Sequence, residues 1–234
     1  MCEEKAPRHF MRPVRSFVLR QGRLTKSQAF ALENNWSIYG IEQAAGELNF
    51  KALFGNDFPV TLEIGFGNGM SLAEMAEQSP EKNFLGIEVH RPGVGRLLHL
   101  IKEKGLKNVR VMDDDAVEII KNRISKNTLD RVQLFFPDPW HKKRHNKRRI
   151  VQTDFIALIA DRLKVGGVFH LATDWEPYAE HMAELMQASL QFKSLSDGAY
   201  SLKPEERPIT KFETRGLKLG HGVWDLMFEK VCEL

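Results

Sequence analysis

The sequence predicts an α/β fold: a mostly parallel sheet with helices on both faces and a C-terminal antiparallel strand pair. Short apolar runs alternate with amphipathic stretches between residues 60 and 190. This alternation is typical of parallel strands that are joined by right-handed helical crossovers. The tail beyond about Phe192 contains two more extended runs, 199–202 and 223–228, which we expect to pair as an antiparallel edge.

Each element of this sheet is indicated by its own local pattern. Strands are expected where apolar runs of five or six residues occur, at 60–64, 83–88, 108–112, 131–136 and 167–172. Helical patterns follow at 71–78, 93–104, 153–163 and 176–190. A short helix is expected to begin at Thr25, because Thr25 and Gln28 have the spacing of a capping box. We therefore expect a basic N-terminal extension with a short helix over 1–55 and the sheet domain over 56–234.

The composition argues against a membrane or secreted protein. Of the 234 residues, 42% are hydrophobic and 28% are charged, and no apolar run is long enough to span a bilayer. The N-terminus lacks the apolar core of a secretory signal, and Cys2 and Cys232 are the only cysteines. We therefore expect a reducing, cytoplasmic location. The net charge is only +3, but arginines crowd the start of the chain at Arg8, Arg12, Arg15, Arg20 and Arg23.

Acidic side chains follow four of the five predicted strands. Glu63 closes the first, Glu88 the second, the cluster 113–115 follows the third, and Asp138 follows the fourth. Ligands of open α/β sheets bind beyond the carboxyl ends of the strands, where these acids are expected to converge. The series therefore predicts a binding site rather than four unrelated turn residues.

A glycine turn beside Glu63 limits which class of ligand is expected to bind there. The run reads G-x-G-x-G at Gly65, Gly67 and Gly69, whereas dinucleotide sites usually read G-x-G-x-x-G. A carboxylate at this place repels pyrophosphate but attracts an ammonium or a sulfonium, and S-adenosylmethionine carries both. Glu88 is placed to accept hydrogen bonds from ribose hydroxyls and Asp115 from the adenine amino group. These roles are typical of the Rossmann-like class I methyltransferases.

The segment 135–149 joins a rigid carboxylate to a basic strip, which we define as residues 142–149. Asp138 lies between two prolines and has little backbone freedom. The strip's cations can bind nucleic-acid phosphates without reading sequence, while Trp140 and the histidines can stack on a base. The alternative is a solvated basic loop after a buried strand. No metal site is expected, because His141 and His145 lack an acidic ligand on the same face.

Several motifs in order resemble one family, the bacterial tRNA (guanine-N7-)-methyltransferases, over most of the chain. They occupy 62–67, 86–90, 136–149, 172–178 and 210–213. The resemblance implies an S-adenosylmethionine-dependent enzyme that converts a guanine of tRNA, expected at position 46 of the variable loop, to 7-methylguanosine. It implies that the cofactor is bound by Glu63, Gly65, Gly67, Gly69, Glu88, Asp115 and Asp138, with Asp138 also catalytic. It implies that the tRNA substrate is bound by Lys142, Arg144, His145, Asn146, Lys147, Arg148, Arg149, Asp174, Thr210, Lys211, Phe212 and Glu213.

The expected reaction needs little proton chemistry. Guanine N7 carries a lone pair and no proton, so positioning should dominate and no general base is required. We assign Asp138 an electrostatic and orienting role, and it can also accept from the guanine N1–H or exocyclic amine. Asp174 either shares base recognition or caps the following helix. Two other functions stay open: a small-molecule methyltransferase and a non-catalytic RNA-binding protein. The sequence leaves homo-oligomer formation undetermined.

Overall fold

The computed structural model describes residues 16–17, 22–210, 213–214, 220 and 222–232. Two of the expected substrate-binding residues, Lys211 and Phe212, lie outside these ranges. Four of the five arginines noted near the start of the chain also lie outside them, namely Arg8, Arg12, Arg15 and Arg20.

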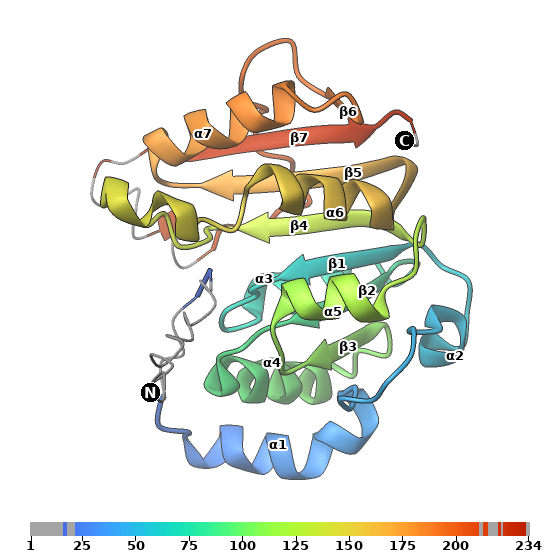
Figure 1. Cartoon of the computed structure of the whole chain (residues 1–234). Coiled ribbons are helices and arrows are strands. Elements are labelled where there is room, and N and C mark those ends of the chain that lie inside the picture. The colour runs from blue at the N-terminus through green and yellow to red at the C-terminus, as the bar shows by residue number, and fades with distance from the viewer. Residues whose placement is uncertain (1–15, 18–21, 211–212, 215–219, 221, 233–234) are drawn as a thin grey trace, which may run out of the picture.

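The sheet has seven strands in the order β3-β2-β1-β4-β5-β7-β6 (Figure 1). Their bounds are β1 Val60–Ile64, β2 Asn83–Ile87, β3 Val109–Met112, β4 Leu129–Phe135, β5 Leu163–Thr173, β6 Phe192–Ser194 and β7 Trp224–Lys230. Strands β1 to β5 pair in parallel, while β7 is antiparallel to both β5 and β6. The predicted fold class is therefore confirmed. The partner of β7 differs from the prediction, because β6 forms at 192–194 and the run 199–202 contributes an isolated bridge from Ser201 to Asp225.

The helices cover both faces of the sheet, as predicted (Figure 1). Their bounds are α1 Lys26–Tyr39, α2 Phe50–Phe54, α3 Met70–Gln78, α4 Arg91–Lys104, α5 Ala116–Arg123, the 3₁₀ helix η1 Lys143–Arg148, α6 Thr153–Arg162 and α7 Glu176–Gln187. One apolar core packs α5, α6 and α7 against the sheet, and a second packs α1, α3 and α4 against the other face. The helices α2, α5 and η1 were not predicted, and α2 and η1, at five and six residues, are too short to show a clear helical period.

The capping box predicted at Thr25 is confirmed and begins a helix longer than expected. Thr25 Oγ1 accepts from the Gln28 N–H at 3.3 Å, and Gln28 Oε1 accepts from the Thr25 N–H at 2.8 Å. Helix α1 then runs along α4. The approach is close because a Cβ at Gly95 would lie 2.8 Å from the Gln28 carbonyl oxygen. Residues far apart in the sequence are thereby joined beside the edge strand β3.

One part of the sheet carries buried polar side chains in place of a helix. On the α3 side, the paired positions of β4, β5 and β7 place Arg131, Gln133, His170 and Asp225 on one face. Helices α3 and α4 pack on β1 to β3, next to this area. Residues 203–207 contact it, because Glu206 pairs with Arg131 and Arg207 with Asp225. This polar face lies directly behind the carboxyl ends of β4 and β5.

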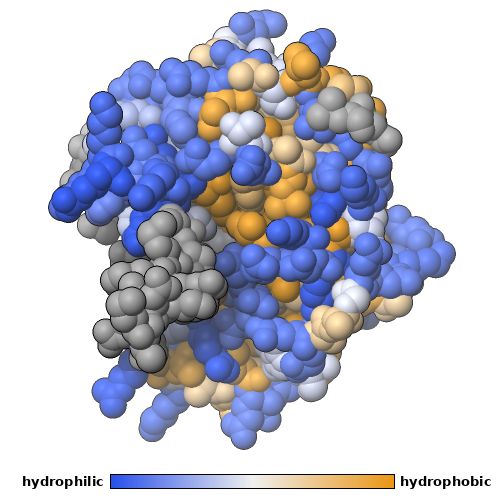
Figure 2. Space-filling model, in the orientation of Figure 1, coloured by the Kyte–Doolittle hydropathy of each residue, from blue (hydrophilic) through white to orange (hydrophobic). Residues whose placement is uncertain are grey.

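The opposite side of the molecule has a mostly hydrophilic surface with apolar side chains exposed near its middle (Figure 2). A groove there runs between α5 and α6 and is lined in part by Val117, Phe155 and Leu158. Among the residues that the structure describes, no helix combines the length and apolar character that a membrane span requires.

Candidate active site at the carboxyl ends of the strands

The glycine turn after β1 has a backbone that only glycine adopts readily. Gly65, Gly67 and Gly69 all have positive φ, at 70°, 59° and 71°. Side chains at these positions would be strained, so the spacing G-x-G-x-G is a conformational requirement. Helix α4 also packs very closely against this turn, because a Cβ at Gly93 would lie 1.9 Å from the Gly67 carbonyl oxygen. Sequence analysis missed Gly93, although the pattern P-G-V-G at the start of a helix was its visible signal.

Glu88 holds the glycine turn in place. Its Oε2 accepts from the Gly67 N–H at 2.8 Å, and its Oε1 accepts from the N–H groups of Val89 and His90 at 2.8 and 3.0 Å. A carboxylate has about four acceptor positions, so one remains for a ligand hydroxyl. The side chain therefore shapes the turn and also faces the space beside it.

That space is the first pocket, of about 230 Å³, at the ends of β1, β2 and β4. Its acidic lining residues are Glu88, Asp114, Asp115 and Asp138. Asp115 caps α5, with its Oδ1 accepting from the Val117 N–H at 3.0 Å. The neighbouring Asp113 pairs instead with Arg91 at 3.4 Å and is not part of the lining. Burial raises the pKa of Asp113, and Arg91 opposes that shift.

A second pocket, of about 560 Å³, adjoins the first across the glycine turn. Both pockets are lined by Gly65, Gly67, Phe135 and Phe136, and the second adds Glu63, His90, Arg96 and Thr210. The two cavities are therefore neighbouring halves of one site. Sequence analysis did not select His90 and Arg96, because neither stands at a strand end.

Glu63 is the most perturbed acid of the site. It is 3% exposed, and within the described chain its Oε2 has no hydrogen-bond partner. Burial, with a contribution from Glu88, raises its pKa to about 8. The carboxyl group is therefore mostly protonated at neutral pH. A cationic ligand group beside Glu63 would favour its ionised form.

Asp138 stands in a constrained turn, as its two prolines predict. The residues on either side of the Pro-Asp-Pro run, Phe136 and Trp140, both have positive φ, at 52° and 48°. The Phe136 N–H donates to the Ala172 carbonyl at 2.8 Å, which anchors the turn to β5. Asp138 itself is exposed and faces the first pocket.

The basic strip contains two arginines that hold the loop together. Arg149 is 6% exposed, its Nε donates to the Pro139 carbonyl at 3.0 Å, and its guanidinium lies 4.7 Å from the Tyr178 ring centre. Arg148 lies over the ring of Trp140 at 4.7 Å. The cations of the strip whose side chains are exposed are Lys142, Lys143, Arg144 and Lys147.

Two other residues of the strip are partly enclosed. The Asn146 carbonyl accepts from the Gln152 side chain at 3.2 Å. Desolvation and the surrounding cations lower the pKa of His145, so its ring is neutral at pH 7. A neutral ring among cations suits contact with a base better than contact with a phosphate.

Asp174 stands in the turn after β5 and is not among the lining residues of either pocket. Asp174 is half-buried, and the N-cap of α7 is Trp175, whose N–H donates to Thr173 Oγ1 at 3.3 Å. The capping alternative for Asp174 is therefore not observed. The ring of His141, the residue before the strip, lies edge-on to Trp175 at 4.4 Å, so the segment that leads into the strip contacts this turn.

The segment after β6 contributes Thr210 and Glu213. Thr210 lines the second pocket, and its Oγ1 accepts from the Glu213 N–H at 3.1 Å. The Glu213 carboxylate faces inward and accepts from Arg207 at 2.7 and 3.3 Å. Sequence analysis missed Arg207, because a single arginine in a proline-rich loop carries no signal of burial. Among the described residues, no group of three or more His, Cys, Asp or Glu side chains is arranged to hold a metal ion.

Most of the chain matches a known protein family. Residues 57–226 match the model of a family described as putative methyltransferases. A tRNA (guanine-N(7)-)-methyltransferase from Yersinia enterocolitica is 59% identical over 221 residues, covering 94% of this chain and 92% of that protein. The chain belongs to the tRNA (guanine-N(7)-)-methyltransferase family. The resemblance drawn from its motifs is thus confirmed.

Other similarities agree with this family. The Salmonella typhimurium protein of the same name is 60% identical over 222 residues, covering 94% of this chain and 93% of its own. The crystal structure of the 16S rRNA methyltransferase KamB superimposes with a TM-score of 0.60 at 17% identity, covering 81% of this chain and 96% of that one. At that identity the likeness concerns the fold alone.

Proposed function

We propose that the protein transfers a methyl group from S-adenosylmethionine to N7 of a guanine in tRNA, at position 46 of the variable loop, giving 7-methylguanosine. The observation that carries the proposal is the pair of adjoining pockets at the ends of β1, β2 and β4. One is lined by acids suited to an adenosine group, and the other offers Glu63 and Thr210. The exposed cations of the basic strip follow in the chain directly after Asp138.

The residues of the first pocket, together with the glycine turn and Glu63 beside it, fit the cofactor. Glu88 and Asp115 present carboxylate acceptors for ribose hydroxyls and an adenine amino group. Gly65, Gly67 and Gly69 let a ligand approach the backbone closely. Glu63 lines the second pocket, and among the described residues its Oε2 has no hydrogen-bond partner, so this carboxyl group suits the ammonium of the methionine portion. When bound, S-adenosylmethionine supplies an electrophilic methyl group.

Asp138 acts by charge and orientation. Guanine N7 has no proton to lose, so no side chain need act as a base toward it. The purine becomes positively charged as N7 is methylated, and a fixed carboxylate at Asp138 stabilises that charge. The constrained Pro-Asp-Pro turn keeps this carboxylate in place without reorganisation. We expect the Thr210 hydroxyl, which borders the second pocket, and Asp174, in the turn after β5, to contact the guanine.

The basic strip binds the tRNA backbone. Lys142, Lys143, Arg144 and Lys147 are exposed and pair with phosphates. Arg148 and Arg149 support the strip through Trp140 and Tyr178, so their contribution to tRNA binding is in part indirect. His145 and Asn146 lie between these groups and are placed to contact a nucleotide.

The remaining assignments follow from this function. A tRNA substrate fits a cytoplasmic location. The family match begins at residue 57, which supports a catalytic domain over 56–234 preceded by an extension over 1–55. Arg23 and the preceding arginines of this extension would add contacts to tRNA.

The test is incubation of the purified protein with labelled S-adenosylmethionine and an unmodified tRNA transcript, followed by nucleoside analysis of the digested RNA. Label in 7-methylguanosine is expected, and a transcript with adenine at position 46 should accept none. Label in the adenine-substituted transcript would contradict the position. Cofactor binding without any label in RNA would favour a small-molecule methyltransferase, and tRNA binding without cofactor binding would favour a non-catalytic RNA-binding protein.

A further inference from the structure

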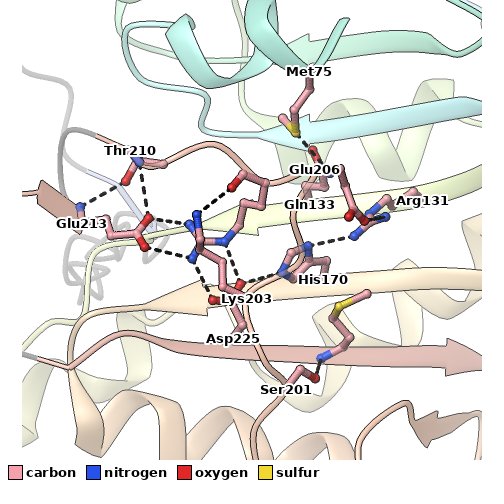
Figure 3. Close-up of polar contacts among 12 residues, drawn as sticks. Met75, Arg131, Gln133, His170, Ser201, Lys203, Glu206, Thr210, Glu213 and Asp225 are labelled. Atoms are coloured by element: carbon pink, nitrogen blue, oxygen red, sulfur yellow. Dashed lines mark hydrogen bonds and ion pairs between the residues drawn. The ribbon is translucent and has the colours of Figure 1, made fainter. Parts of the chain in front are cut away.

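A buried polar network lies behind the site, on the polar face of β4, β5 and β7 (Figure 3). It consists of Arg131, His170, Asp225, Arg207 and Glu213. Arg207 is 1% exposed and contacts two carboxylates. Its Nη1 and Nη2 donate to Glu213, and its Nη2 also donates to Asp225 Oδ2 at 2.7 Å. Its Nε lies 2.7 Å from Asp225 Oδ1, as an ion pair without hydrogen-bond geometry.

His170 continues the network to β4. Its Nε2 lies 2.7 Å from Asp225 Oδ1, and its Nδ1 lies 3.0 Å from Arg131 Nη2. Because a guanidinium can only donate, Nδ1 must accept, and Nε2 must carry the proton that reaches Asp225. His170 is therefore neutral. Desolvation and the charge of Arg131 lower its pKa, although the hydrogen bond to Asp225 opposes them.

A gain in stability alone does not account for a buried network of charged side chains. Buried ion pairs are often no more stabilising than apolar side chains of similar size, because charges lose their hydration on burial. An apolar core packs against the opposite face of the same sheet. What a charged network adds is a single arrangement of its partners, since each hydrogen bond fixes direction as well as distance.

The network joins the two halves of the site. The Arg207 guanidinium lies 5.7 Å from the ring centre of Phe135 and 5.8 Å from that of Phe136. These two rings line both pockets and lead directly into Pro137 and Asp138. On its other side Arg207 holds Glu213, whose N–H donates to Thr210 Oγ1. A single side chain thus contacts the segment that ends in Asp138 and the segment that borders the second pocket.

We propose that Arg207 is a positioning residue, which sets Thr210 relative to the Asp138 turn through Glu213 and Asp225. This inference rests on the proposed function, because it assigns the part of the second pocket beside Thr210 to the target guanine. Thr210 Oγ1 accepts from the Glu213 N–H, and its hydroxyl donates to none of the residues that the structure describes, so we assign its hydrogen to the base. Glu213 then acts on substrate through Thr210 and Arg207, and its own carboxylate stays bound to Arg207.

The test is Arg207→Lys, which keeps the charge but removes the planar fork that binds two carboxylates. The control is Arg162→Lys, at another buried arginine whose Nε and Nη2 donate to the carbonyls of Ile120 and Lys121 at 2.9 and 3.2 Å. Methyl transfer is measured in a single turnover with saturating cofactor and tRNA. Cofactor affinity, thermal stability and hydrogen exchange at the Glu213 and Thr214 amides are measured on the same samples.

In Arg207→Lys, transfer is expected to slow by about 100-fold, as for a reacting group displaced by about 1 Å, while cofactor affinity stays unchanged. The Glu213 and Thr214 amides should exchange faster than in the wild type. Arg162→Lys should change neither readout, whatever its effect on melting temperature. Equal slowing in both variants, or unchanged exchange at Glu213, would overturn the proposal.

A second variant keeps the proposal testable if Arg207→Lys does not fold. Glu213→Gln leaves Arg207 paired with Asp225 and keeps the side-chain shape, so it should show the same pattern with a smaller slowing. Normal transfer with normal exchange in Glu213→Gln would equally overturn the proposal. The exchange measurement needs no substrate. If the wild-type protein methylated no guanine in tRNA, the proposed function would fail, while the exchange at Glu213 would still decide the role of Arg207.

Discussion

The strand-end pocket and the buried polar network behind it place their residues in opposite ways. The pocket is built by side chains that stand in turns directly after apolar strands, such as Glu88 and Asp138. The network takes one residue each from β4, β5 and β7 and two from a loop. The order and direction of the strands therefore determine which side chains meet in the pocket. Orientation behind the sheet depends on tertiary contacts between segments that are remote in the sequence.

This difference predicts how each region responds to change. A substitution in the pocket should weaken one contact with the ligand and leave the others, because its acids have distinct ligand partners. The network should fail as a unit, because Asp225 holds both His170 and Arg207. The following substitutions test the first region and set the scale against which the network variants are measured.

Asp138→Asn should have the largest effect on turnover. The substitution keeps the side-chain shape but removes the charge that stabilises the methylated purine, so kcat should fall by about 100- to 1,000-fold. Affinity for tRNA, measured by filter binding, should stay close to that of the wild type. Asp197→Asn, at an exposed acid far from the pocket, is the matched control. Parallel losses in turnover and affinity would make Asp138 an RNA-binding residue instead.

Gly93→Ala should weaken cofactor binding next most strongly. The new methyl group would lie 1.9 Å from the Gly67 carbonyl oxygen, so the glycine turn or α4 must move. Overpacking of this kind costs about 1 to 3 kcal/mol, which corresponds to about a 5- to 100-fold loss of affinity. Calorimetric titration with S-adenosylhomocysteine measures it. Gly198→Ala, where an added Cβ has only the Tyr200 carbonyl oxygen nearby, should bind normally.

Neutralising the exposed cations of the strip should weaken tRNA binding moderately. In the triple variant Lys142→Ala, Arg144→Ala and Lys147→Ala, the dependence of log affinity on log salt should flatten by about one unit for each lost phosphate contact. A control triple variant at Lys102, Lys107 and Lys193 removes the same charge from exposed positions outside the site. An unchanged salt slope in the strip variant would show that the basic strip is ordinary solvated surface that does not bind tRNA phosphates.

Glu63 should give the most specific effect, which is on the pH dependence of stability. Its pKa is about 8 in the folded protein against 4.5 for an ordinary glutamate, so the folded state holds an extra proton between these values. The free energy of unfolding should therefore fall as pH rises from about 4.5 to 8, by up to about 1.4 kcal/mol per pH unit. Glu63→Gln has no carboxyl group to titrate, so it should not show this contribution to the pH dependence.

The check on Glu63 is the difference in melting temperature between Glu63→Gln and the wild type across this pH range. The variant should gain on the wild type as pH rises and the gain should level off above pH 8. A constant difference would show that Glu63 is ionised throughout. Adding S-adenosylhomocysteine, whose ammonium we place beside Glu63, should reduce the difference.

Much of the first region could be predicted from the sequence. The parallel strands, the glycine turn and the acids after each strand are local features, and local features determine which residues stand at strand ends. The structure adds Gly93 and the inward orientation of Arg149. Gly93 left a signal in the pattern P-G-V-G, whereas burial of one cation in a basic run is set by packing and was not predictable.

The second region was largely hidden from sequence analysis. His170 stands inside an apolar strand and Arg131 begins another, so each looks like an isolated polar residue. Arg207 lies between two acidic residues and a proline, in a segment with the composition of an exposed loop. Only the antiparallel insertion of β7 beside β5 brings Asp225 to His170. The Thr210 to Glu213 motif was found by resemblance, but its support from Arg207 required the fold.

The most direct test of the site is a crystal structure of the protein with bound S-adenosylhomocysteine. We predict that the ribose hydroxyls lie within hydrogen-bond distance of Glu88, that the adenine amino group lies near Asp115, and that the ammonium faces Glu63. The second pocket, bordered by Thr210, should stay open for a base. A ligand bound elsewhere, or with its adenine beside Thr210, would contradict the assignment of the two pockets.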